Sequence, residues 1–173
     1  MSNWYMVTVV GHDQPGIVAA LSRALYQGDW GLGESSMARL GGNFTIMMMV
    51  QGEGNESDLL QVIEPVGASQ GLHVHVDRIQ AELHQHATPN VQIRVYGADR
   101  TGIVADVTGY LADAGLTILD LNSDVSGSDE EPVYVMVLDG YVENGVDALD
   151  SAVKQLSSKG LKVDVEPIDI VVG

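Results

Sequence analysis

The chain has 173 residues, no cysteine and a formal net charge of −16. The lack of cysteine excludes disulfide bonds, thiolate metal sites and a cysteine nucleophile. The acidity, without any cluster of Lys or Arg, argues against direct binding to nucleic acid, because an acidic protein repels the phosphate backbone.

The sequence also carries no signal for a membrane. No apolar run approaches the length of a membrane span, and the first residues lack the basic segment and cleavage site of a signal peptide. We therefore expect a cytoplasmic protein with no membrane contact.

The first half contains, in chain order, the patterns of a strand, a helix, two strands, a helix and a strand. β-Branched and aromatic runs indicate strands, and apolar residues three and four apart indicate helices. The expected strands are residues 4–10, 32–40, 44–51 and 71–77, and the expected helices are residues 17–28 and 56–70.

Single residues refine these elements. Asp13 is a candidate N-cap of the first helix, and Pro15 suits its first turn, where a missing N–H costs nothing. Gly41-Gly42-Asn43 suits the positive φ angles of a tight antiparallel hairpin. Pro65 is expected to kink or shorten the second helix, and Trp30 is expected to pack in the core.

The second half repeats the first. Residues 11–19, Gly-His-Asp-Gln-Pro-Gly-Ile-Val-Ala, return 86 positions later as residues 97–105, Gly-Ala-Asp-Arg-Thr-Gly-Ile-Val-Ala. The same order of elements follows, with a longer hairpin at residues 126–132. We therefore expect two domains, residues 1–83 and 91–173, joined by a polar linker at residues 84–90.

Each half has the element order β-α-β-β-α-β, which predicts the α+β fold class. The expected architecture is ferredoxin-like, with an antiparallel four-stranded sheet and two helices on one of its faces. Domains of this size have little core to spare and leave a sheet edge exposed, so we also expect a homodimer.

The repeated turn and residues 39–45 resemble the ACT domain family, small βαββαβ modules that bind amino acids and often act in pairs. The residues that carry this resemblance are Asp13, Pro15, Gly16, Ile17 and Val18 in the first copy, and Asp99, Arg100, Thr101, Gly102, Ile103 and Val104 in the second. A chain of two such domains is similar to the glycine cleavage system transcriptional repressor family. That resemblance implies an amino-acid-responsive regulator.

The turn has the chemistry that an α-amino acid requires. Free N–H groups at a helix N-terminus attract the carboxylate, and a nearby aspartate accepts hydrogen bonds from the ammonium. In the family, the pocket also includes the second strand of a neighbouring domain. The candidate ligand-binding residues are therefore Asp13, Gln14, Gly16, Ile17, Glu34 and Ser36, and in the second copy Asp99, Arg100, Gly102, Ile103, Asp120 and Asn122.

The two copies keep the aspartate and differ around it. Arg100 is a candidate carboxylate ligand in the second copy, whereas the first copy has Gln14 at that position. We therefore expect one pocket to bind more tightly than the other. A simpler role for Asp13 and Asp99 stays open, in which each aspartate caps a helix and binds no ligand.

Other chemistry is weakly represented. His73 and His75 alternate on a strand near His84 and His86, but no carboxylate completes a ligand set, so no metal site is expected. We find no nucleophile with a base, phosphate loop or dinucleotide fingerprint, and hence expect no catalytic residue and no cofactor.

These patterns predict a non-catalytic regulatory protein. We expect it to bind a small amino acid such as glycine or serine and to act on a protein partner such as a transcription factor. Two alternatives stay open, a ligand-independent dimerisation or interaction module and a regulatory subunit of an amino-acid biosynthetic enzyme.

Overall fold

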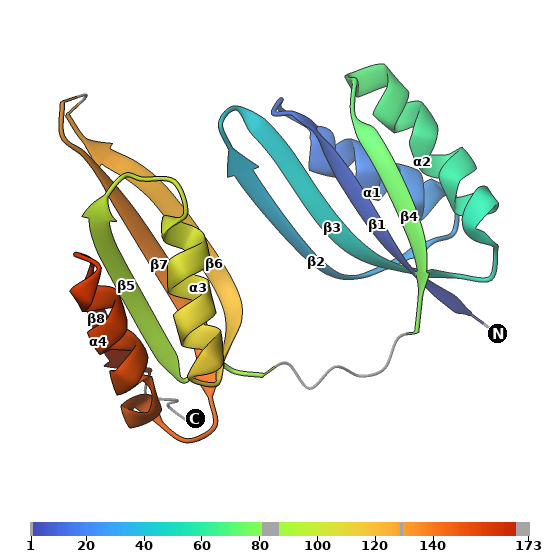
Figure 1. The fold of residues 1–173 in the computed structure, drawn as a ribbon. Helices are drawn as coiled ribbons and strands as arrows, with labels where there is room; N and C mark the ends of the chain where they lie inside the picture. Colours follow the sequence, from blue (N-terminus) through green and yellow to red (C-terminus); the bar gives the residue numbers. More distant parts are fainter. Residues whose placement is uncertain (1, 81–86, 129, 169–173) are drawn as a thin grey trace. The chain divides into compact units, whose positions relative to one another are not determined.

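A computed structural model of the chain describes residues 2–80, 87–128 and 130–168. The chain divides into two compact units, Met1–His84 and Gln85–Gly173 (Figure 1). Of the expected linker, residues 84–86 lie outside the described residues, and residues 87–90 belong to no helix or strand. Each unit is described by itself below.

The first unit is one antiparallel sheet of four strands with two helices. The strand order across the sheet is β2-β3-β1-β4, and every neighbouring pair is antiparallel. The elements are β1 (Asn3–His12), α1 (Ile17–Gln27), β2 (Gly31–Leu40), β3 (Asn43–Gly52), α2 (Glu56–Gln70) and β4 (His73–Ile79).

The second unit repeats this topology, with the strand order β6-β7-β5-β8. Its elements are β5 (Val91–Ala98), α3 (Ile103–Asp113), β6 (Leu116–Gly127), β7 (Pro132–Val142), the 3₁₀ turn η1 (Val146–Leu149), α4 (Asp150–Ser158) and β8 (Lys162–Pro167). Two four-stranded sheets with this order confirm the predicted α+β, ferredoxin-like class.

Both cores form between a sheet and its two helices, which lie on the same side of it (Figure 1). Alternate residues of a strand point to opposite faces, so each strand gives half of its side chains to the core. In β1 these are Tyr5, Val7 and Val9, which pack with Leu21 and Leu25 of α1. The expected anchoring role of Trp30 is confirmed, because its ring is buried and meets Tyr5 edge to face at 5.7 Å.

The other face of each sheet carries no helix, and we call it the open face. On the open face of the first unit, strand register places the mainly apolar Trp4, Met6, Thr8 and Val10 of β1 and Met47 and Met49 of β3, beside His73, His75 and Asp77 of β4. On the open face of the second unit it places Gln92, Arg94 and Tyr96 of β5 and Asp164 and Glu166 of β8, beside Asp139, Val137 and Val135 of β7. The central strand β1 thus presents mainly apolar side chains there, whereas β5 presents mainly polar ones. The two open faces therefore differ in chemistry although the fold is shared.

The structure corrects the expected capping of the first helix. Helix α1 begins at Ile17 with Gly16 as its N-cap residue, and no side chain caps it. Neither the Asp13 side chain nor, in α3, the Asp99 side chain acts as a cap, and Pro15 precedes the helix. Gly16 begins the helix because the backbone turns there with φ 91°, a left-handed conformation that glycine adopts without steric cost.

The expected effect of Pro65 is also corrected in part. Helix α2 runs without interruption from Glu56 to Gln70 with Pro65 inside it, so the proline does not shorten the helix. The predicted hairpin is present, and Gly41 and Gly42 have φ of 56° and 76°. These positive angles are those that a two-residue hairpin turn requires.

Candidate functional site

The repeated turn has the same backbone in both units. Gly16 and Gly102 precede α1 and α3 with φ of 91° and 89°, and no atom lies within 4 Å of where a Cβ would be. These glycines are thus required by the backbone angle rather than by a close neighbour. At Gly11 a close neighbour favours glycine instead, because a Cβ there would lie 2.7 Å from the Leu72 side chain.

A hairpin closes over the turn in each unit. The Asp13 N–H donates to the Gly42 carbonyl at 3.0 Å, which brings the β2–β3 hairpin beside the start of α1. In the second unit the Asp99 N–H donates to the Pro132 carbonyl at 3.3 Å, at the β6–β7 hairpin. The hairpins differ in length, so different side chains reach the two turns.

The first turn borders an open cavity of about 370 Å³. Among its lining residues, the charged side chains are Asp13 and Arg39, which form an ion pair at 2.6 Å between the carboxylate Oδ2 and a guanidinium nitrogen. Met37 and Phe44 give it an apolar wall. The predicted residues Asp13, Gln14, Gly16 and Ile17 therefore lie together around one cavity.

This arrangement is complementary to a zwitterion. The first N–H groups of a helix have no partner inside the helix, and those of α1 begin at this cavity, which residues 17–19 also line. A ligand carboxylate would bind between these N–H groups and the guanidinium of Arg39, and a ligand ammonium would bind to the carboxylate of Asp13. The cavity wall therefore carries a negative group, Asp13, and a positive group, Arg39, close enough to form an ion pair.

The second turn borders a different cavity, of about 420 Å³. Its lining consists of Ala98 and Asp99 from the end of β5 and of residues 130–133 from the hairpin. Asp99, Glu130 and Glu131 are its charged members, and none of the described lining residues is basic. The lining also includes neither Gly102 nor Ile103.

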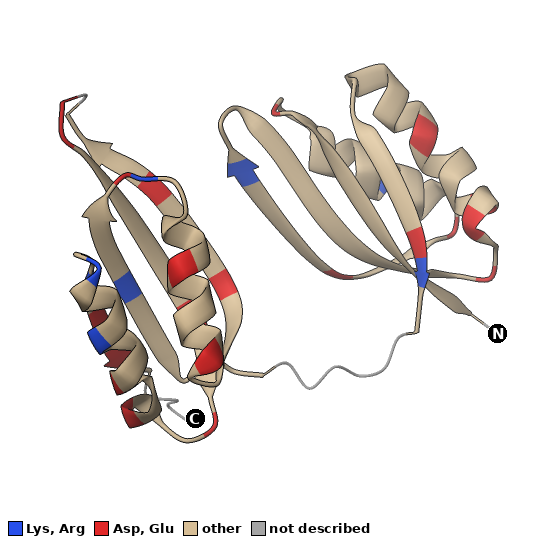
Figure 2. Cartoon of the chain, in the orientation of Figure 1, with Lys and Arg blue, Asp and Glu red and all other residues tan. Residues whose placement is uncertain are grey.

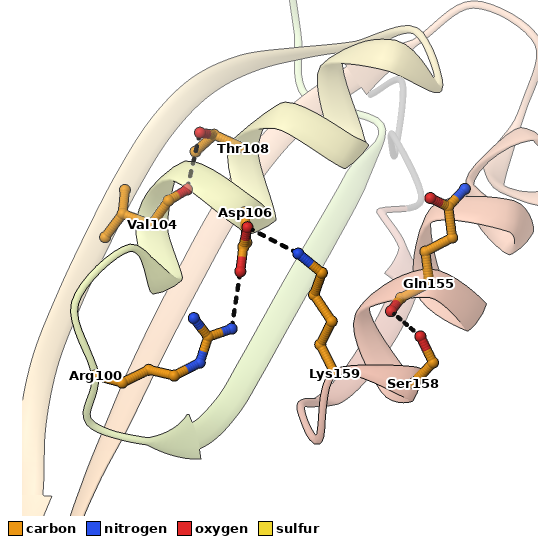
Figure 3. Close-up of polar contacts among 7 residues, drawn as sticks. All are labelled: Arg100, Val104, Asp106, Thr108, Gln155, Ser158 and Lys159. Atoms are coloured by element: carbon orange, nitrogen blue, oxygen red, sulfur yellow. Dashed lines mark hydrogen bonds and ion pairs between the residues drawn. The ribbon is translucent and has the colours of Figure 1, made fainter.

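The residue after the aspartate braces the turn in both units. In the first unit the Gln14 side-chain amide donates to the Gln70 carbonyl at the end of α2, at 2.7 Å. In the second unit Arg100 donates to the Asp106 carboxylate at 2.8 Å, and Lys159 after α4 binds the same carboxylate at 3.0 Å (Figure 3). The predicted role of Arg100 as a carboxylate ligand is thus in competition with an ion pair inside the chain.

The ion pairs among Arg100, Asp106 and Lys159, which we call the brace, shift the pKa values of Asp106 and Lys159. The hydrogen bond from Arg100, followed by that from Lys159, lowers the pKa of Asp106 below its usual 3.8. The hydrogen bond to Asp106, followed by that to Tyr110, raises the pKa of Lys159 above its usual 10.5. The ammonium of Lys159 also lies 5.0 Å from the centre of the Tyr110 ring.

The strand residues that the family resemblance suggested lie elsewhere. Ser36 pairs opposite Met47 on the open face, and Glu34 lies in the irregular segment of β2 between Leu32 and Ser35. Asp120 and Asn122 of β6 hydrogen-bond to each other at 2.6 Å. None of the four lines either cavity.

Sequence reasoning missed the strand residues that do line the first cavity, Met37 and Arg39 of β2 and Phe44 of β3. Arg39 and Phe44 stand directly opposite each other in the hairpin, and Phe44 also stands opposite Gly11 of β1. Side chains alternate between the two faces of a strand. Counting back from the hairpin glycines would therefore have placed Arg39 on the same sheet face as Phe44 and Gly11, next to the turn.

Within the described residues, no three His, Cys, Asp or Glu side chains are grouped as a metal site would require. His75 pairs with Asp77 at 3.1 Å, and His84 and His86 lie outside the described residues. Across residues 2–80, 87–128 and 130–168, no helix is both long enough and apolar enough to cross a membrane.

Two family models match the chain. Residues 4–77 match one model of the ACT domain, and residues 91–158 match another. Together they cover most of both units.

Curated relatives share limited identity with the chain. It is 25% identical over 130 residues to the glycine cleavage system transcriptional repressor of Escherichia coli (strain K12), covering 75% of this chain and 68% of that protein. It is 33% identical over 72 residues to the UPF0237 protein YjhC of Lactococcus lactis subsp. lactis (strain IL1403), covering 41% of this chain and 83% of that protein.

Two solved structures share the fold over the whole chain. One is an unknown protein from Galdieria sulphuraria, with a TM-score of 0.76 and 24% identity, covering 98% of this chain and all of that one. The other is a candidate glycine cleavage system transcriptional repressor, with a TM-score of 0.74 and 19% identity, covering 98% of this chain and 99% of that one.

Proposed function

Because the chain belongs to the ACT domain family, with one such domain in each half, we propose that it senses a small amino acid and regulates a protein partner. The match of both halves to a family of regulatory domains confirms the prediction that the chain is regulatory and not an enzyme. The finer parts of the proposal are the ligand, the partner and the process under control.

The cavity beside the first turn carries the ligand proposal. A carboxylate, a guanidinium and the N-terminus of a helix all line this cavity of about 370 Å³. These groups match the two charges of an α-amino acid and leave a short apolar wall, Met37 and Phe44, for its side chain. Glycine and serine are the first candidates because they are small and the name of the curated relative refers to glycine cleavage.

The name of the curated relative in Escherichia coli supports a role in transcription. We propose that this chain likewise modulates transcription of genes for amino-acid metabolism. Acidic side chains are spread over both units, whereas Lys and Arg are few (Figure 2). A surface of this charge does not favour contact with DNA, so a separate DNA-binding protein is the proposed partner.

The expected homodimer and cytoplasmic location belong to the same proposal. Strand β2 lies at the edge of its sheet and all ten of its residues are exposed, and unpaired edges of this kind favour pairing with another chain.

Calorimetry of the full chain tests the ligand proposal. We expect glycine or serine to release or absorb measurable heat and to raise the thermal unfolding midpoint, because a ligand that binds only the folded state stabilises it. The full set of common amino acids should be titrated under the same conditions. If none of them gives heat or a thermal shift, amino-acid sensing is wrong and the ligand-independent interaction module becomes the better interpretation.

A further inference from the structure

The two turns differ in a strand residue that no motif includes. In the first unit Gly11 of β1 stands opposite Phe44 of β3, and Phe44 stands opposite Arg39 of β2. In the second unit Gly97 of β5 stands opposite Tyr134 of β7, and Tyr134 stands opposite Val125 of β6. Gly11 and Gly97 are equivalent in the repeat, so Val125 occupies the position of Arg39.

This replacement removes the cation from the second turn. The lining of the first cavity has one acidic and one basic side chain, Asp13 and Arg39, and is formally neutral. The lining of the second cavity has three acidic side chains, Asp99, Glu130 and Glu131, and no described basic one, so its formal charge is −3. The net charge of the lining therefore repels a ligand carboxylate in the second case and does not in the first, where Arg39 can donate to it.

Arg100 does not restore the missing charge. Its guanidinium binds the carboxylate of Asp106, which Lys159 also binds, and both distances are 3.0 Å or shorter. Figure 3 shows the Arg100 side chain directed from the turn toward α3. Arg39 is also in an ion pair, with Asp13, but both members of that pair line the first cavity. Neither Arg100 nor Asp106 lines the second cavity.

We infer that the first domain is the amino-acid-binding domain, that Arg39 selects ligands with a free carboxylate, and that the second turn binds no α-amino acid. This inference rests on the proposed function and deepens it by assigning the binding to one of the two repeats. The second domain would then serve the partner or the assembly rather than the ligand.

Calorimetry with matched ligands and variants tests the inference. The ligands are glycine and serine, each compared with its primary amide, which keeps the ammonium and lacks the carboxylate charge. For the wild-type chain we expect one binding site per chain and at least about tenfold tighter binding of the acid than of the amide, a typical effect of a charged hydrogen bond.

The variants are Arg39→Val, Arg39→Gln and the control Arg23→Val. Both Arg39 variants should bind the amino acid at least about tenfold more weakly and lose the preference for the acid. Arg23 is an exposed residue of α1 that does not line the cavity, so its variant loses the same charge and should bind as the wild type does. Because the Arg39 side chain is 62% exposed, both Arg39 variants should stay folded, which tryptophan fluorescence checks.

The outcomes separate this inference from the proposed function. Two equal sites per chain, or a preference for the acid that survives in either folded Arg39 variant, would overturn the inference while amino-acid sensing stands. If the wild-type chain binds no amino acid, both the inference and the proposed function are wrong.

Discussion

The two domains meet the same structural need with different chemistry. In each, the side chain of the residue after the aspartate anchors the turn to a helix of its own domain. The first domain uses a neutral bond from Gln14 to the Gln70 carbonyl, and the second uses Arg100, Asp106 and Lys159. A basic residue inside a ligand-binding motif is therefore weak evidence for a ligand until its partners inside the chain are known.

The open faces extend this contrast. On the second open face, Arg94 donates to Glu166 at 3.0 Å and to the Gln92 side chain, which in turn donates to Asp139 at 2.8 Å. On the first open face, Thr8 holds the position of Arg94, with Met47 opposite it. The central strand is mainly apolar on the first open face and mainly polar on the second, so the two domains are expected to meet different surfaces.

The largest expected effect tests whether the two cores are separate. Leu25 and Leu111 are equivalent helix residues, each almost fully buried in its own core. Replacing either by Ala should reduce the free energy of unfolding of its domain by about 2–5 kcal/mol, because a cavity is left. Both tryptophans, Trp4 and Trp30, are in the first domain, so tryptophan fluorescence during urea unfolding reports on that domain alone.

The transition seen by tryptophan should therefore move to lower urea in Leu25→Ala and stay in place in Leu111→Ala. Circular dichroism should detect the loss in both variants. An equal shift of the tryptophan signal in the two variants would show that the cores unfold as one unit.

The next effect should be the same in both domains. Gly16→Ala and Gly102→Ala force a side chain into a left-handed conformation and should each cost about 1–2 kcal/mol of stability. Gly109→Ala in the middle of α3 is the control, since a Cβ there meets no atom within 4 Å and alanine favours a helix. Urea unfolding should show a loss in the first two variants and none in the control, and unequal losses at Gly16 and Gly102 would contradict the equivalence of the turns.

A smaller effect should be confined to the second open face. Arg94 and Glu166 are 38% and 58% exposed, and exposed ion pairs contribute up to about 1 kcal/mol. A double-mutant cycle with Arg94→Met and Glu166→Gln should give a coupling below this value that vanishes in high salt. A coupling that persists in molar salt would mean that the pair is not simply exposed.

The smallest effect is the acid response of the brace in the second domain. The pKa of Asp106 is lowered in the folded state, so its contribution to stability is present above 3.8 and is lost as the pH falls through the lower folded value. Asp106→Asn should remove this part of the pH dependence, and Asp113→Asn, an exposed change on the same helix, should leave it intact. The first domain has Ala20 at the position of Asp106 and should lack this response.

Circular dichroism follows the acid unfolding of both domains, and tryptophan fluorescence identifies the part that belongs to the first. If Asp106→Asn and wild type show the same pH dependence between neutral pH and about pH 2, the brace does not contribute in the way that its pKa implies.

The sequence predicted the elements well because each sheet has one covered face. Alternation in β1 and helical spacing in α1 both follow from burial on one side, and the glycines at 41 and 42 mark a turn with positive φ. The predicted N-cap of α1 was wrong because a candidate capping residue, Asp13, stands near Gly16, a glycine that begins the helix through its backbone angle.

The site was harder to predict because it depends on contacts between distant segments. Arg39 reaches Asp13 through the register of a hairpin, and Arg100 is held by an aspartate that also binds Lys159, 53 positions away from it. Local patterns contain neither relation. The four strand residues suggested by family resemblance remain a prediction.

Gly11 and Gly97 show which positions of the repeat are held constant by packing and which are free to diverge. Each lets the start of the last strand of its domain, at Leu72 or Leu161, lie against the first strand, where a Cβ would collide. If the halves descend from one ancestral domain, glycines such as these were retained because a Cβ would meet the Leu72 or Leu161 side chain, whether or not a ligand is bound. The residues that differ, at positions 14 and 39 and their counterparts 100 and 125, then mark where the functions of the two domains diverged.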